Sequence, residues 1–156
     1  VLTGETNMDV PVSYRKQYEK KADTCMTQHT HLFPETAEVL TALKNRGAKL
    51  GIVSSKYRSR IQELTDVAFP KGFFDLIVGA EDVNAHKPSP EGLLFSLRHL
   101  QTDLVDALYV GDSTIDAETA QTAKVDFCGI LHGLTTYDEL AVYPYQAIAK
   151  DLHILL

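Results

Sequence analysis

Short apolar runs and longer segments with helical spacing follow one another along this chain. The runs that predict strands are residues 49–53, 74–78, 107–110, 126–131 and 146–149. The segments whose apolar residues recur every three or four positions, which predict helices, are 11–28, 34–47, 57–68, 90–100, an Ala-rich stretch ending at 123, and 137–142. Because strands and helices alternate, we expect an α/β fold with a doubly wound parallel sheet and helices on both faces.

Residues typical of helix ends support two of these segments. Pro34 suits the first position of the helix over 34–47, and Gly47 suits the position just past its end. Ser89 is expected to cap the helix over 90–100, with Pro90 in its first turn. The leucines of that helix then form one apolar face.

Polar side chains stand where three of the predicted strands end, or in the loop that follows. Ser54 and Ser55 close the first strand, Lys87 ends the loop after the second, and Asp112 follows the third, with Asp116 four residues on. In a parallel sheet these points share one edge. Hydroxyls, a fixed cation and two carboxylates suit a phosphate monoester with Mg²⁺, which prefers carboxylate oxygens and substrate phosphates.

Each of these residues also has a structural interpretation. Ser54 and Ser55 suit the cap of the next helix, and a lone lysine such as Lys87 is usually a solvated surface residue. Asp116 stands three residues after Ser113, as in a capping-box-like helix start. Asp112 is harder to explain structurally, because folding seldom needs a carboxylate directly after a buried strand and a glycine.

Composition and charge exclude several classes of function. The 156 residues are 44% hydrophobic, and 15 Lys and Arg stand against 21 Asp and Glu. A net charge of −6 argues against a nucleic-acid partner, and no apolar run is long enough to span a membrane. Cys25 and Cys128 are expected to be free thiols, so we expect a cytoplasmic protein. Cys25, His29 and His31 lack the fourth ligand of a structural zinc site, which favours a chance arrangement.

Three motifs resemble those of the haloacid dehalogenase superfamily, in the family's order and nearest to its phosphoglycolate phosphatase and β-phosphoglucomutase branch. They read Leu-Gly-Ile-Val-Ser-Ser-Lys over 50–56, His-Lys-Pro-Ser-Pro over 86–90 and Val-Gly-Asp-Ser-Thr-Ile-Asp over 110–116. The resemblance implies that Ser54 and Ser55 bind phosphate and that Lys87 neutralises it. It implies that Asp112 and Asp116 hold Mg²⁺, and that the Lys87–Pro88 bond is cis.

The family's first motif, an Asp-x-Asp that supplies the nucleophile, does not occur in this sequence. By the resemblance, residues 1–30 hold the last part of a helical cap and its linker, and residues 31–156 hold the Rossmann-like core without its first strand. That strand would lie between the strand ending at Ser54 and the one ending at Asp112. We therefore expect about 70 to 90 further residues, from one strand and most of a small cap, or a second chain that completes the sheet.

These features together predict a Mg²⁺-dependent phosphatase for a small phosphorylated metabolite, acting through an aspartyl-phosphate on a segment outside this chain. The chain alone is then expected to be inactive. An alternative is a non-catalytic phosphate-binding or regulatory module of the same fold. A receiver domain is disfavoured because its acidic cluster precedes its Lys-Pro, and no P-loop sequence is present.

Overall fold

The computed structural model describes residues 31–156. The chain divides into two units, Val1–His31 and Leu32–Leu156, and the second carries the fold described below. The expected cap helix over 11–28 lies outside the described residues, as do Cys25 and His29. The predicted division into cap remnant and core therefore stays a prediction.

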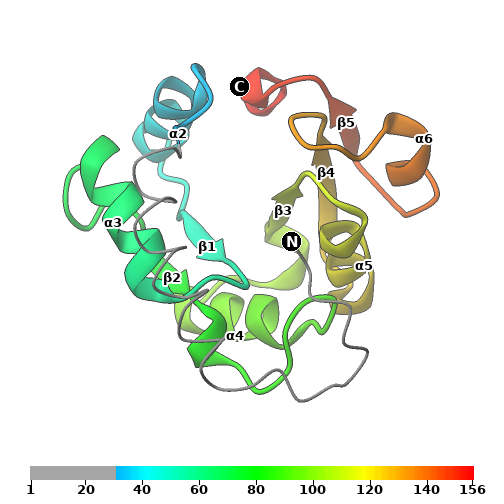
Figure 1. Ribbon diagram of the computed structural model, residues 1–156, viewed down its shortest axis with the longest axis horizontal. Coiled ribbons are helices and arrows are strands. Elements are labelled where there is room, and N and C mark those ends of the chain that lie inside the picture. Colours follow the sequence, from blue (N-terminus) through cyan, green and yellow to red (C-terminus); the bar gives the residue numbers. More distant parts are fainter. Residues whose placement is uncertain (1–30) are drawn as a thin grey trace, which may run out of the picture. The chain divides into compact units, whose positions relative to one another are not determined.

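The second unit alternates strands and helices along its whole length (Figure 1). Its strands are β1 (Gly51–Val53), β2 (Leu76–Val78), β3 (Leu108–Gly111), β4 (Asp126–Ile130) and β5 (Ala147–Ala149). Its α-helices are α2 (Thr36–Asn45), α3 (Arg58–Ala68), α4 (Glu91–Leu100), α5 (Thr114–Ala123) and α6 (Tyr137–Leu140). The α/β class is confirmed. None of the helices within residues 31–156 has the length and apolar character needed to cross a bilayer.

The strands form two parallel sheets, where the sequence predicted one. β1 pairs with β2, and β4 lies between β3 and β5. β1 and β3 face each other in Figure 1 without a ladder between them, so within residues 31–156 each has one edge that pairs with no other strand. Leu108 on β3 is 46% exposed, although strands of a parallel sheet are normally covered. The interruption falls where the resemblance places the missing strand.

Helix ends follow the expected residues with small shifts. Gly47 has φ of +87°, the left-handed conformation that favours glycine just after a helix, as predicted. Pro34 lies in a turn before α2, which begins at Thr36, so its predicted place as first helical residue is wrong. The sequence predicts Ser89 as the N-cap of α4 and Pro90 as its first residue, but Pro90 is the N-cap and Glu91 the first residue. Ser89 Oγ, one residue earlier, accepts the N–H of Glu91.

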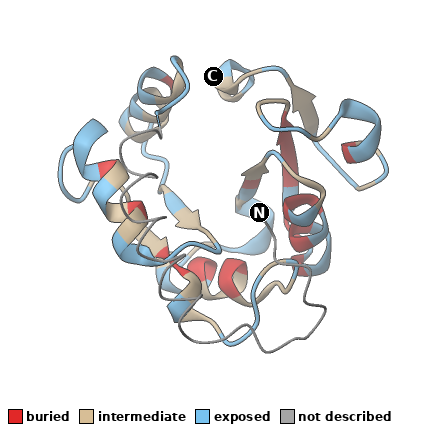
Figure 2. Cartoon of the chain, viewed as in Figure 1, coloured by how far each residue is buried: buried red, intermediate tan, exposed pale blue. Residues whose placement is uncertain are grey.

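The core lies around α5 and the sheet β3-β4-β5, with α4 packed against it (Figure 2). Its members include Leu93, Leu97, Tyr109, Phe127 and Leu140. α4 also contacts β1 and β2, so it supports the strands on both sides of the interruption. On α3, Ile61 and Thr65 are buried and Ala68 is exposed.

Candidate functional site

Ser54, Ser55 and Lys87, from two different loops, line one small hollow at the ends of β1 and β2. The remaining lining residues are Val53, Val78, Gly79, Val83, Ala85, His86, Ser89 and Gly92. Hydroxyls and two basic side chains therefore gather on an apolar base, and no carboxylate lines the hollow. Such a set of donors suits an oxyanion.

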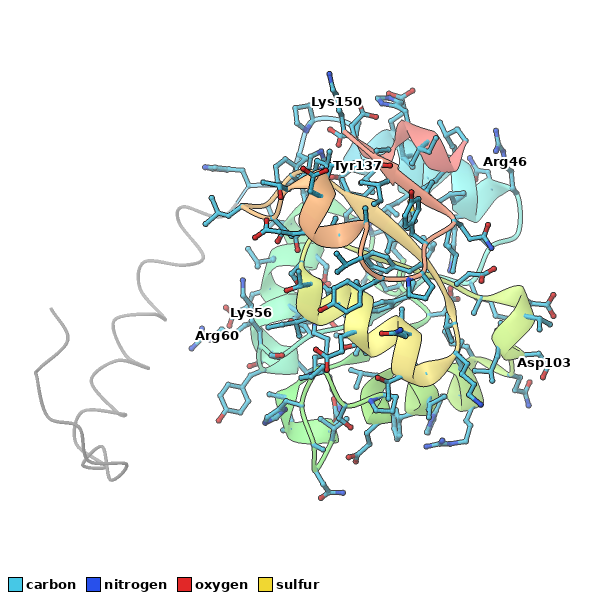
Figure 3. The ribbon with its side chains drawn as sticks, turned by 90° about the vertical axis from the view of Figure 1, so that its right-hand side faces the viewer. Arg46, Lys56, Arg60, Asp103, Tyr137 and Lys150 are labelled. Atoms are coloured by element: carbon cyan, nitrogen blue, oxygen red, sulfur yellow. The ribbon has the colours of Figure 1, made fainter. Side chains whose placement is uncertain are left out.

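The hollow opens at the carboxyl edge of the strands. Lys56 and Arg60, which follow β1, point to one side of the unit in Figure 3. Arg46 and Asp103, which precede β1 and β3, lie on the opposite side. Ser54 and Asp112 directly follow β1 and β3, so they stand at the edge at which open α/β sheets bind ligands.

Two acidic residues hold the loop that carries Ser54 and Ser55. Both carboxylate oxygens of Glu81 accept the N–H of Arg58, at 3.0 and 3.1 Å, and Asp82 binds the Arg58 guanidinium. Ser54 Oγ accepts only the N–H of Lys56, at 3.1 Å, and α3 has no side-chain cap from its own segment. The interpretation of Ser54 and Ser55 as caps of α3 is therefore wrong, because Glu81 takes that role from the next loop.

A third carboxylate holds the loop before Lys87. Glu91 accepts the N–H groups of Asn84 and Ala85, each at 2.9 Å. These bonds lower the pKa of Glu91 below its usual range. The N–H of Ser89 binds the carbonyl of His86 at 2.9 Å, and the Lys87–Pro88 bond is cis, as predicted.

Asp116 lies at the centre of a hydrogen-bonded network and is 6% exposed. Its Oδ1 accepts Lys87 Nζ at 2.6 Å and the Tyr109 hydroxyl at 3.2 Å. Its Oδ2 accepts the Ser113 hydroxyl at 2.6 Å, while Ser113 Oγ accepts the Asp116 N–H. Ser113 is therefore the N-cap of α5, while the Asp116 carboxylate accepts the Ser113 hydroxyl and also joins α5 to Lys87.

This network sets the protonation of its members. Burial alone would raise the pKa of Asp116, but hydrogen bonds from Lys87 and Ser113 and the charge of Lys87 hold it below its usual range. Burial and the nearby carboxylates of Asp116 and Asp112 raise the pKa of Tyr109, so the phenol stays protonated and donates. Asp116 is therefore a carboxylate whose bonds go largely to protein.

Asp112 differs from Asp116 in its surroundings. It is exposed and makes no side-chain hydrogen bond or ion pair to another residue within 31–156. Gly133, after β4, approaches it so closely that a Cβ there would lie 2.6 Å from Asp112 Oδ2. Within residues 31–156 no three His, Cys, Asp or Glu side chains gather as a metal site. Asp112 is thus the carboxylate with free oxygens, and Asp116 is the anchored one.

Sequence reasoning missed four residues of this arrangement, namely Tyr109, Glu81, Glu91 and Gly133. Tyr109 stands at a core position of β3, where burial of the ring accounts for an aromatic residue without any role for its hydroxyl. Glu81 and Glu91 resemble any surface carboxylates, because a side chain that caps backbone N–H groups in another segment leaves no local pattern. Only a short apolar run ending in glycine marked Gly133.

Comparison with known proteins identifies the family. The model for "Haloacid dehalogenase-like hydrolase" matches residues 3–130. A phosphoglycolate phosphatase of Salmonella typhi is 30% identical over 142 residues, 91% of this chain and 56% of that protein. One of Aquifex aeolicus is 38% identical over 95 residues, 61% of this chain and 45% of that protein. This chain spans about half the length of these two relatives.

A solved structure agrees with both the family and the fold. A crystal structure from Bacteroides fragilis, described as a haloacid dehalogenase-like hydrolase, superposes with a TM-score of 0.93 at 46% identity. The match covers 99% of this chain and 74% of that one. With the motifs at the strand ends and the family model over most of its length, the chain belongs to the haloacid dehalogenase-like hydrolases.

Proposed function

We propose that this chain carries the phosphate-binding and metal-binding part of a Mg²⁺-dependent phosphatase that acts on a small phosphorylated metabolite. The observation that carries the proposal is the meeting of Ser54, Ser55 and Lys87 in one hollow without a carboxylate, while Asp112 stands free at the end of β3. The names of the relatives from Salmonella typhi and Aquifex aeolicus support the same class of reaction.

The carboxylates of Asp112 and Asp116 suit part of the coordination shell of Mg²⁺. Mg²⁺ is commonly held by one or two carboxylates, with water and substrate phosphate oxygens completing its ligands. Asp112 would supply a direct ligand, and Asp116 would support it from the network that also fixes Lys87. When bound, the ion would neutralise charge on the phosphoryl oxygens.

The protein's own side chains would position the phosphoryl group. Lys87 has three N–H donors, and Asp116 takes one, so two remain for phosphate oxygens. The hydroxyls of Ser54 and Ser55 would donate from the opposite loop. The carboxylates of Glu81 and Glu91 hold these two loops, so that little ordering would be needed when substrate binds.

A nucleophile would come from a further parallel strand between β1 and β3. Such a strand would use the free edges of both and give the order β2-β1-new strand-β3-β4-β5. Since carboxyl ends of parallel strands share an edge, the new strand would end between Ser54 and Asp112. An aspartate there would attack phosphorus and form an aspartyl-phosphate, while the P–O bond to the metabolite breaks and the metabolite leaves as an alcohol after taking up a proton. Water would then hydrolyse the aspartyl-phosphate and release inorganic phosphate and the free aspartate.

The test is hydrolysis of p-nitrophenyl phosphate with Mg²⁺. We expect no activity from the 156-residue chain and activity from a longer product whose coding sequence upstream of Val1 includes Asp-x-Asp. Asp112→Asn in the longer product should then lose most of the rate. Hydrolysis by the 156-residue chain that depends on Asp112 would refute the external nucleophile. An upstream sequence without Asp-x-Asp would favour a non-catalytic module.

A further inference from the structure

We infer that His86 is a phosphate-binding residue, whose imidazole donates a hydrogen bond to an oxygen of the phosphoryl group beside Lys87. This inference rests on the proposed function, because it takes the hollow as the phosphate site. It adds a ligand-contacting side chain to Ser54, Ser55 and Lys87. The class of ligand is a phosphate monoester or inorganic phosphate.

The first support is the position of His86. It lines the hollow and directly precedes Lys87. Its loop is held on both sides, by Glu91 on the N–H groups of Asn84 and Ala85 and by the bond from Ser89 N–H to the His86 carbonyl. The backbone of His86 is therefore fixed at the wall of the hollow before any ligand binds.

The second support is the unused hydrogen-bonding capacity of the imidazole. His99 contacts the carbonyl of Phe95, His132 lies 2.9 Å from a Glu35 oxygen, and His153 lies 3.0 Å from an Asp151 oxygen. The ring of His86 has no hydrogen bond or ion pair with any other residue in 31–156. A side chain at a polar hollow with free donors is available to a ligand.

The third support is electrostatic. Lys87 and His86 are the two titratable side chains that line the hollow, and the charge of Lys87 is shared with Asp116 at 2.6 Å. Glu91, which holds the loop of His86, is already engaged with backbone N–H groups. An imidazole N–H of His86 would therefore add a donor to phosphate beside Lys87, whose own charge is shared with Asp116.

The experiment measures binding of inorganic phosphate to the 156-residue chain by NMR at pH 7. We expect His86→Leu, which removes the donor, to weaken phosphate binding about 3- to 10-fold, the size of one hydrogen bond at an exposed site.

His153→Leu is the matched control, since His153 is exposed, pairs with Asp151 and does not line the hollow. It should bind phosphate as the wild type does. Ser54→Ala tests the hollow independently of His86, because the Ser54 hydroxyl accepts only one exposed backbone bond. We expect a loss of affinity for that variant.

The outcomes separate the inference from the proposed function. If His86→Leu binds phosphate as tightly as wild type while Ser54→Ala binds it weakly, the role of His86 is wrong and the phosphate site stands. If Ser54→Ala also binds normally, or if wild type binds no phosphate at tens of millimolar, the hollow is not the phosphate site and both fall.

Discussion

Replacing Lys87 by methionine tests whether the contact between Lys87 and Asp116 is a buried ion pair that organises the site. Its atoms lie 2.6 Å apart, with 19% of the Lys87 side chain and 8% of the Asp116 side chain exposed. Removing one partner of a buried pair costs about 3 to 5 kcal/mol. Asp116 keeps the hydroxyls of Ser113 and Tyr109, so we expect the low end, about 3 kcal/mol of unfolding free energy at pH 7.

Urea unfolding of the 156-residue chain measures this loss, and Lys44→Met is its control. Lys44 also lies 2.6 Å from an aspartate, Asp75, but the side chains are 29% and 34% exposed. A pair of that kind contributes at most about 1 kcal/mol. Losses of similar size in the two variants would refute the burial argument.

The pH dependence gives a second check. In the wild type the pKa of Asp116 is lowered, so its contribution is present above its unfolded pKa of about 3.9 and is lost as the pH falls through the lower folded pKa. Without Lys87, burial should raise the folded pKa of Asp116 above that value. The carboxylate then destabilises the fold at neutral pH and does so less as acid protonates it. The penalty of Lys87→Met should therefore shrink between pH 7 and pH 4, and a constant penalty would contradict this account.

Three further substitutions test the scaffold of the site. Ser113→Ala removes the cap of α5 and a donor to Asp116, so urea unfolding should show a loss of about 1 to 2 kcal/mol in unfolding free energy. The control Ser59→Ala, at an exposed position of α3, should change the unfolding free energy little. Gly111→Ala would place a Cβ 2.4 Å from the Asp116 Cβ, and we expect about 1 to 3 kcal/mol of destabilisation, more than for Gly51→Ala, whose Cβ would meet atoms at 3.2 Å. Glu81→Ala should increase hydrogen exchange of the Arg58 amide about tenfold, since that N–H loses its acceptor. Glu81→Gln should restore most of the protection, because its amide oxygen can still accept that N–H. Glu63→Ala should leave the exchange unchanged. Equal exchange of the Arg58 amide in all three variants would contradict the role of Glu81 as its acceptor.

The sequence predicted the elements of the fold well because apolar spacing and helix-end residues act locally. Gly47 is an example, since it permits the backbone conformation that ends α2. The predicted positions of Pro34 and Ser89 were each shifted by one or two residues, because a proline fits a turn before a helix as readily as its first turn. Thr65 lies on the buried face of α3, which apolar spacing does not indicate, because its hydroxyl bonds the carbonyl of Gln62 at 3.1 Å.

The site was predictable to the extent that strand ends converge. Ser54, Lys87 and Asp112 follow different strands, and parallel pairing alone brings such positions to one edge. That Asp116 is held by hydrogen bonds while Asp112 stays exposed was not predictable in this way. It depends on Tyr109, seven residues before Asp116 on the neighbouring strand, and on a lysine 29 residues away.

The ion pair between Lys87 and Asp116 also connects the two sheets of the unit. β1 and β3 share no hydrogen bonds, so the sheet is interrupted between them. Lys87 follows β2 on one side of this interruption, and Asp116 lies on α5 beside β3 on the other. The ion pair between Lys87 and Asp116 therefore spans the interruption. α4 also spans it by apolar packing against β1, β2 and α5. A strand bound between β1 and β3 would therefore pair with two strands that the Lys87–Asp116 pair and α4 already connect, with that ion pair beside its carboxyl end. If this is correct, breaking the pair with Lys87→Met should weaken the binding of that strand as well as the binding of phosphate, whereas Lys44→Met should affect neither.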